Sequence, residues 1–182
     1  MTPGRVVFGV LVLVGCTKPE ARPPAPPARL VAPDPVDDCT LQTKLVPGIP
    51  GSPGHLIASD INPNGASELA MLMRQMQKDL GAARVTVLDG GTVASMWPRH
   101  RKLRCSWPTD PADRTPAFDG LAATYLGQVR AFDQAPSATT FDSVLTACRS
   151  CHDNSCPGPV VVIEGLRLPG HDGGPPTANT SK

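Results

Sequence analysis

The chain has 182 residues, with 17 lysines and arginines against 16 aspartates and glutamates, and a formal net charge of +1 at pH 7. A nearly balanced charge, with one short basic cluster at 99–104, gives nucleic-acid binding no support, because such clusters are more often solvated faces. The foldable stretch, residues 52–169, is long enough for a single domain core.

The first fifteen residues are typical of an export signal. Arg5 precedes an apolar run over 6–14 that is too short to span a bilayer as a mature helix. The run ends in Leu-Val-Gly-Cys at 13–16, which resembles the bacterial lipobox, in which the cysteine is lipidated and becomes the first mature residue. We therefore expect residues 1–15 to be a lipoprotein signal peptide and Cys16 to carry the anchor. An ordinary secretory peptide with an incidental cysteine is the alternative.

Export would place the mature chain outside the cytoplasm, where disulfides persist. Thr17, and not aspartate, follows the lipidated cysteine, which by resemblance to sorting rules in many Gram-negative bacteria favours an outer-membrane lipoprotein facing the periplasm or the cell surface. Residues 16–54 are rich in proline and predict an extended tether, whose last turns wrap over the folded part. We expect a folded domain over 55–168 and a disordered tail over 169–182.

The folded domain begins with helical periodicity. Apolar residues spaced three and four apart predict a helix over 66–88, with Asn64 as its cap and the glycines at 90–91 as its end. Residues 85–88 could instead form a short strand. A proline interrupts residues 92–104, so that at most a short helix is expected there.

Two further apolar stripes predict two further helices. One begins with Thr115 as cap and Pro116 in the first turn, and the other begins near Ser137. The last helix carries apolar and chemically active side chains on one side, namely Phe141, Val144, Leu145, Cys148, Cys151 and His152. The run 160–163 is either a helical turn or a strand-like cover.

The most informative motif is CxxCH at residues 148–152, the attachment pattern of c-type haem. Each thiol adds across one vinyl group of the porphyrin, and on a helix the next histidine lies under the iron as the proximal ligand. The motif predicts haem c attached through Cys148 and Cys151, with His152 on the iron.

Three other sites also use a CxxC pair: a structural disulfide, a zinc half-site and a thioredoxin-like redox pair. Zinc requires a second pair, and only the isolated Cys156 and His171 follow; thioredoxin requires a βαβ pattern, which is not seen. One lipidated cysteine and two on haem leave three candidates for disulfides, Cys39, Cys105 and Cys156. An odd number leaves one thiol free or bridged to another molecule, and the sequence does not choose the pair.

CxxCH on the last of three or four helices, with methionines on the first, resembles the cytochrome c′ superfamily, the class II c-type cytochromes. The resemblance covers roughly residues 65–156. It implies an all-α fold, an antiparallel four-helix bundle with one covalent haem in its core. This chain departs from the family in a short or degenerate second helix and in the residues that follow CxxCH. Segments 67–76, 107–111 and 156–159 are similar to haem lipoproteins of myxobacteria and related organisms.

In this superfamily the iron position opposite the proximal histidine holds a methionine of the first helix or stays open to small gases. Met73 and Met76 lie on the apolar stripe, whereas Met71 points nearly opposite. We expect Met73 as the distal ligand, with Met76, an open site or His100 as alternatives.

We expect an anchored electron carrier, not an enzyme, that passes single electrons between redox partner proteins. A five-coordinate protein that binds or senses NO or CO is the alternative; a peroxidase would require a distal histidine and arginine over the iron. Arg74 and Arg99 are candidate partners of haem propionates, although a solvated arginine is the commoner case. His55 and His171 are expected at the surface. The sequence does not decide whether the protein is a monomer or a homodimer.

Overall fold

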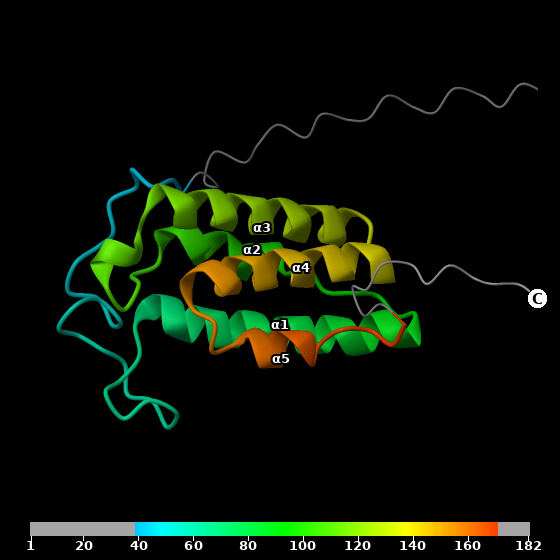
Figure 1. Ribbon diagram of the computed structural model, residues 1–182, viewed down its shortest axis with the longest axis horizontal. Helices are drawn as coiled ribbons and strands as arrows, with labels where there is room; N and C mark the ends of the chain where they lie inside the picture. Colours follow the sequence, from blue (N-terminus) through cyan, green and yellow to red (C-terminus); the bar gives the residue numbers. More distant parts are fainter. Residues whose placement is uncertain (1–38, 171–182) are drawn as a thin grey trace, which may run out of the picture. The chain divides into compact units, whose positions relative to one another are not determined.

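The computed structural model describes residues 39–170 and is built from helices (Figure 1). Within these residues there are five α-helices and no strand. Their bounds are α1 Glu68–Asp89, α2 Trp97–His100, α3 Pro116–Gln134, α4 Ala138–Ser155 and α5 Val160–Glu164, with 3-10 turns η1 Arg101–Cys105 and η2 Pro111–Asp113. The expected all-α class is confirmed.

Several predicted features lie outside the described residues. They are the signal peptide, the lipobox cysteine Cys16, most of the proline-rich tether, His171 and the tail beyond Gly170. Of the helices in residues 39–170, none combines the length and the apolar character that a membrane crossing needs.

Helix α1 starts two residues later than its apolar pattern predicts. The hydroxyl of Ser67 accepts a hydrogen bond of 3.1 Å from the Ala70 amide, so Ser67 is the cap and the prediction of Asn64 was wrong. Asn64 lies instead in the preceding turn. At the other end Gly90 adopts φ 67° and its amide closes the last turn, as expected, so residues 85–88 are helical and not a strand.

The segment 39–54 is joined to the helices. A disulfide links Cys39 to Cys105, and the Trp107 indole N–H donates to the carbonyl of Val46 at 2.6 Å. Gly51 accepts from the Glu68 amide at 3.1 Å, and a Cβ on Gly51 would lie 2.3 Å from that nitrogen, so only glycine fits there. The folded unit thus extends ahead of residue 55, and the turns at 47–54 contact the start of α1.

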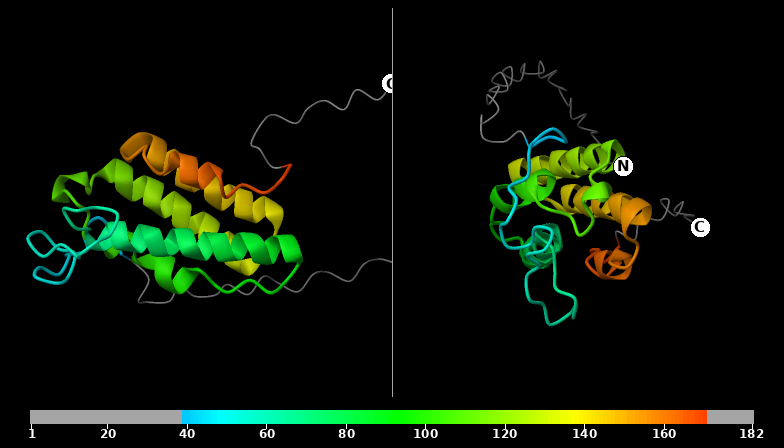
Figure 2. Two further views of the ribbon diagram at one scale, coloured as in Figure 1. Left: turned by 90° about the horizontal axis from the view of Figure 1, so that it is seen from below. Right: turned by 90° about the vertical axis from the view of Figure 1, so that its left-hand side faces the viewer.

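Helices α3 and α4 form an antiparallel pair, and both begin where the sequence predicts. Thr115 caps α3 with Pro116 in its first turn, and Ser137 opens α4 through a reciprocal capping box. Their facing sides supply the centre of the core, where the most deeply buried residues include Phe132, Phe141, Val129, Val144 and Leu145. Figure 1 shows α4 between α3 and α1, and Figure 2 shows α5 against α4.

The region predicted as at most a short helix is α2 continued by η1. Pro98 lies in the first turn of α2, where its missing N–H costs no helical hydrogen bond. The carboxylate of Asp133 in α3 accepts from the amides of Met96 and Trp97 at 3.1 and 2.9 Å and fixes the start of α2. This part of the chain therefore contains one short helix and a 3-10 turn in place of a long helix.

Candidate functional site

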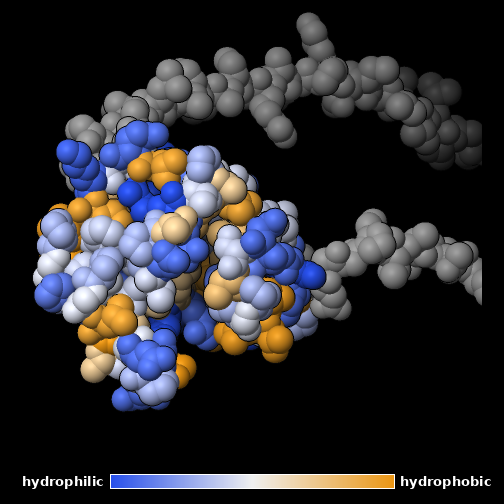
Figure 3. Space-filling view, turned by 60° about the vertical axis from the view of Figure 1, so that its left-hand side comes forward, coloured by the Kyte–Doolittle hydropathy of each residue, from blue (hydrophilic) through white to orange (hydrophobic). Residues whose placement is uncertain are grey.

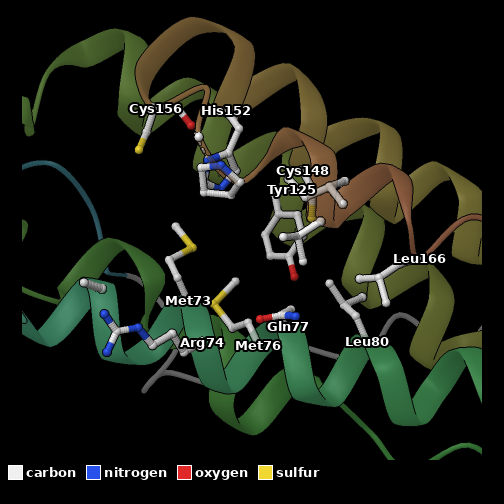
Figure 4. A pocket seen from close by; sticks show the side chains of 15 residues that line it. Met73, Arg74, Met76, Gln77, Leu80, Tyr125, Cys148, His152, Cys156 and Leu166 are labelled. Carbon is white, nitrogen blue, oxygen red and sulfur yellow. Dashed lines mark hydrogen bonds between the residues drawn. The ribbon is translucent and has the colours of Figure 1, made fainter. Parts of the chain in front are cut away.

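The CxxCH residues lie in the last turns of α4, and Figure 4 shows Cys148 and His152 on the side that faces α1. The chain reverses after Cys156 and returns as α5, which packs back on α4. Side chains from α1, α4 and α5 therefore converge around the motif, although α1 is distant in sequence from the other two helices.

Two cavities meet at this point. The α5-side cavity, of about 420 Å³, is bounded by α1, α4 and α5, and Cys148 lies in its wall. The α3-side cavity, of about 510 Å³, is bounded by α1, α4 and the start of α3, and Cys151 lies in its wall. Both volumes fall in the range of cofactor sites. The residues shared by both walls are Ala70, Met73, His152 and Cys156.

The α5-side cavity is largely apolar. Its wall includes Leu80 from α1 and Val162, Ile163 and Leu166 from α5 and the residues after it. The sequence analysis left 160–163 as either a helical turn or a cover; the segment is helical, and it closes the cavity. Val161 on the outer side of α5 is 81% exposed. Figure 3 shows apolar side chains interspersed with hydrophilic ones on one face of the molecule.

His152 is held in the tautomer that a metal ligand requires. Its Nδ1 lies 2.9 Å from the backbone carbonyl oxygen of Cys156. Because a carbonyl only accepts, Nδ1 must donate its hydrogen, which leaves the lone pair of Nε2 free. An N–H···O=C bond of this kind is the usual support of an iron- or zinc-bound histidine. The residues present therefore fit a haem iron.

The three candidate methionines of α1 are placed differently. Met73 is half-buried and lies in the wall of both cavities, whereas Met76 is 3% exposed and lines the α5-side cavity alone. Met71 lines neither cavity, and its sulfur accepts a hydrogen bond of 3.4 Å from the Arg74 guanidinium. Figure 4 shows Met73 and Met76 projecting from α1 toward α4, with the His152 ring opposite Met73.

The two motif cysteines are free thiols in this structure. Burial raises the pKa of Cys148 to about 12 and also raises the pKa of Cys151. A thioredoxin-like pair needs a lowered thiol pKa, because the thiolate is the nucleophile, so the environment opposes that alternative. Within residues 39–170, no three His, Cys, Asp or Glu side chains gather as ligands of a bare metal ion.

The two candidate arginines differ in position. Arg74 borders the α5-side cavity, and its guanidinium donates to the Ser59 hydroxyl at 2.7 Å. Arg99 pairs with Asp79 and is not among the residues that line either cavity. His100 does not line them either, because it is fully buried behind Tyr125, and in this arrangement it is no distal ligand.

Tyr125 is the site residue that the sequence analysis missed, since it was counted only as part of an apolar stripe. It is 3% exposed and lines the α5-side cavity, and its hydroxyl lies 2.6 Å from His100 Nδ1. Burial raises the pKa of Tyr125 well above its ordinary value, so the phenol stays protonated.

The structure places the three candidate disulfide cysteines. Cys39 and Cys105 form the disulfide, with Cα atoms 5.4 Å apart. Cys156 is a free and exposed thiol beside both cavities. Comparison of the chain with protein-family models, with curated proteins and with solved structures found no match.

Proposed function

We propose that this protein carries one covalent c-type haem and transfers single electrons. One observation carries the proposal: two free thiols, an imidazole with an available Nε2 and a methionine sulfur lie in the walls of two adjoining cavities. Cys148 lines one cavity, Cys151 lines the other, and His152 lines both. This is the distribution expected if one flat group fills both cavities.

Each residue then has a distinct role. Cys148 and Cys151 would form the two thioether bonds, and His152 would bind the iron through Nε2 while the Cys156 carbonyl holds the ring. When bound, the haem supplies an iron that cycles between the ferric and ferrous states. The apolar wall from α5 would shield part of the bound group from water and would favour its less charged oxidation state.

Met73 distinguishes an electron carrier from a gas-binding protein. It is the methionine shared by the two cavities and lies opposite the His152 ring, which supports its thioether as the residue that would bind the iron together with His152. Methionine raises the haem potential and keeps small gases from the iron. The alternative function, a five-coordinate protein for NO or CO, requires Met73 to leave the iron open.

The fold supports the same proposal. Three long helices, α1, α3 and α4, with α2 and η1 in place of a second long helix, are compatible with a degenerate four-helix bundle. CxxCH on the last long helix is the arrangement that the resemblance to the cytochrome c′ superfamily implies. We infer that the chain is a divergent protein of this type.

Acid-acetone extraction of the purified, denatured protein tests the proposal directly. We expect the haem to stay on the polypeptide, because thioether bonds survive conditions that remove non-covalent haem. We also expect a six-coordinate, low-spin visible spectrum that does not change under CO. Haem that extracts freely, or protein without haem, contradicts the proposal; a high-spin spectrum that responds to CO supports the gas-binding alternative.

The proposed anchor has its own test. Cys16→Ser removes the acceptor of the lipid, and we expect the exported protein to move from the membrane to the soluble fraction. Two or more acyl chains anchor a protein stably, whereas one binds marginally. Thr17→Ser, which keeps the cysteine, is the control and should stay with the membrane. Retention of Cys16→Ser in the membrane would contradict lipidation.

A further inference from the structure

A chain of three polar side chains leads from a surface cavity to the candidate haem site. His100 of α2 is fully buried; its Nδ1 lies 2.6 Å from the Tyr125 hydroxyl and its Nε2 lies 3.3 Å from a carboxylate oxygen of Asp79. Tyr125 lines the α5-side cavity, whereas Asp79 lines a different cavity of about 170 Å³. The imidazole thus bridges two cavities that share no lining residue.

Haem binding does not require this histidine, since the proposed ligands are elsewhere. Burying an ionisable ring is costly, and an apolar side chain would fill the same space. Burial lowers the pKa of His100 below its ordinary value, while the nearby Asp79 carboxylate acts in the opposite direction. The ring is therefore neutral at pH 7 and ready to accept a proton if negative charge is added nearby.

The groups that face His100 come from three helices. Asp79 on α1 and Asp133 on α3 favour the charged imidazole, and Arg99 on α2 opposes it. Tyr125 on α3 contacts the ring directly and is stacked on it at 5.9 Å between ring centres. Cys148 on α4 lines the same cavity as Tyr125.

Protonation of His100 would reverse the direction of its hydrogen bond with the Tyr125 hydroxyl. Nε2 lies 3.3 Å from the Asp79 carboxylate without an aligned hydrogen bond, and the negative charge favours a hydrogen on this nitrogen of the neutral ring. Nδ1 then accepts from the Tyr125 hydroxyl. Once a proton occupies Nδ1 as well, the phenol oxygen must accept, and its own hydrogen becomes available to the α5-side cavity that Tyr125 lines. One proton added to His100 thus reorients the Tyr125 hydroxyl in the wall of the candidate haem site.

We propose that His100 takes up one proton when one electron enters the haem site, so that this protein couples electron transfer to proton uptake. The inference rests on the proposed function. The electron comes from a redox partner and the proton from solvent; one N–H bond forms, no bond breaks in the protein, and the net charge of the molecule is unchanged. The coupling arises because negative charge added in a low-dielectric core raises the proton affinity of a nearby imidazole.

The midpoint potential of the haem-loaded protein, measured from pH 5 to 9, tests the coupling. The potential should fall as the pH rises above the pKa of His100 in the oxidised protein, and level off above its pKa in the reduced protein. The steepest slope is about 59 mV per pH unit, for one proton per electron. His100→Gln should flatten this dependence, and Tyr125→Phe should weaken it, because the hydroxyl that connects the ring to the cavity is lost.

His55→Gln is the matched control, since His55 is exposed and outside the site; its slope should equal that of the wild type. NMR titration of the His100 imidazole in the oxidised and reduced wild type needs no variant and should give a higher pKa in the reduced protein. Equal pKa values, a flat wild-type potential, or an unchanged slope in His100→Gln overturns the inference. A haem-bearing protein with a flat potential overturns this coupling alone, whereas a protein without haem overturns the proposed function as well.

Discussion

Replacing both motif cysteines, Cys148→Ala with Cys151→Ala, is expected to remove all covalently attached haem. Each thioether bond needs its own thiol, and of the two motif cysteines Cys148 lines one cavity and Cys151 the other. After acid-acetone extraction no haem colour should remain on the polypeptide. Either single substitution should retain one thioether bond and hence covalent haem in reduced yield.

The matched control is Cys156→Ala. Cys156 is also a free thiol in the wall of both cavities, but it is outside the CxxCH motif. This variant should keep its full haem content, because its backbone carbonyl, which holds His152, is unaffected. Covalent haem in the double variant, or its loss in Cys156→Ala, would show that attachment uses other thiols. The double variant should also unfold at lower denaturant concentration, since the two cavities lose their occupant.

Met73→Ala is expected to have the second largest effect, on the iron itself. Removal of the thioether should abolish the far-red sulfur-to-iron charge-transfer band and allow CO to bind the ferrous protein. The midpoint potential should fall by on the order of 0.1 V, a part of the range of about 0.8 V that axial ligands span. These quantities are measured by visible spectroscopy and redox titration.

Two neighbouring methionines serve as controls for this experiment. Met76→Ala should cost about 2–5 kcal/mol of stability, because Met76 is buried in the core, but should keep the charge-transfer band. Met71→Ala should change neither the stability nor the charge-transfer band, since Met71 lines neither cavity and its sulfur contacts Arg74. Loss of the band in Met76→Ala in place of Met73→Ala would assign the ligand to Met76. A wild type that is high-spin and binds CO would support the gas-binding alternative.

Short-range sequence signals predicted much of the helical framework. Thr115 and Ser137 cap helices because their hydroxyls satisfy amides two or three residues ahead, which is a local property of the chain. The first helix was misjudged by two residues, because Asn64 and Ser67 are both good caps, and the choice depends on Gly51 packing against Glu68. That contact joins residues far apart in sequence.

The sequence by itself predicted the attachment chemistry that we propose, since CxxCH brings two thiols and an imidazole onto adjacent turns of any helix that contains it. Only the tertiary structure decided which cysteines pair, that Met73 and not Met76 lies in both cavities, and that His100 is buried against Tyr125. The physical reason is range. Caps and motif spacing depend on residues within one or two helical turns, whereas disulfides, cavities and buried hydrogen bonds depend on how separate helices pack.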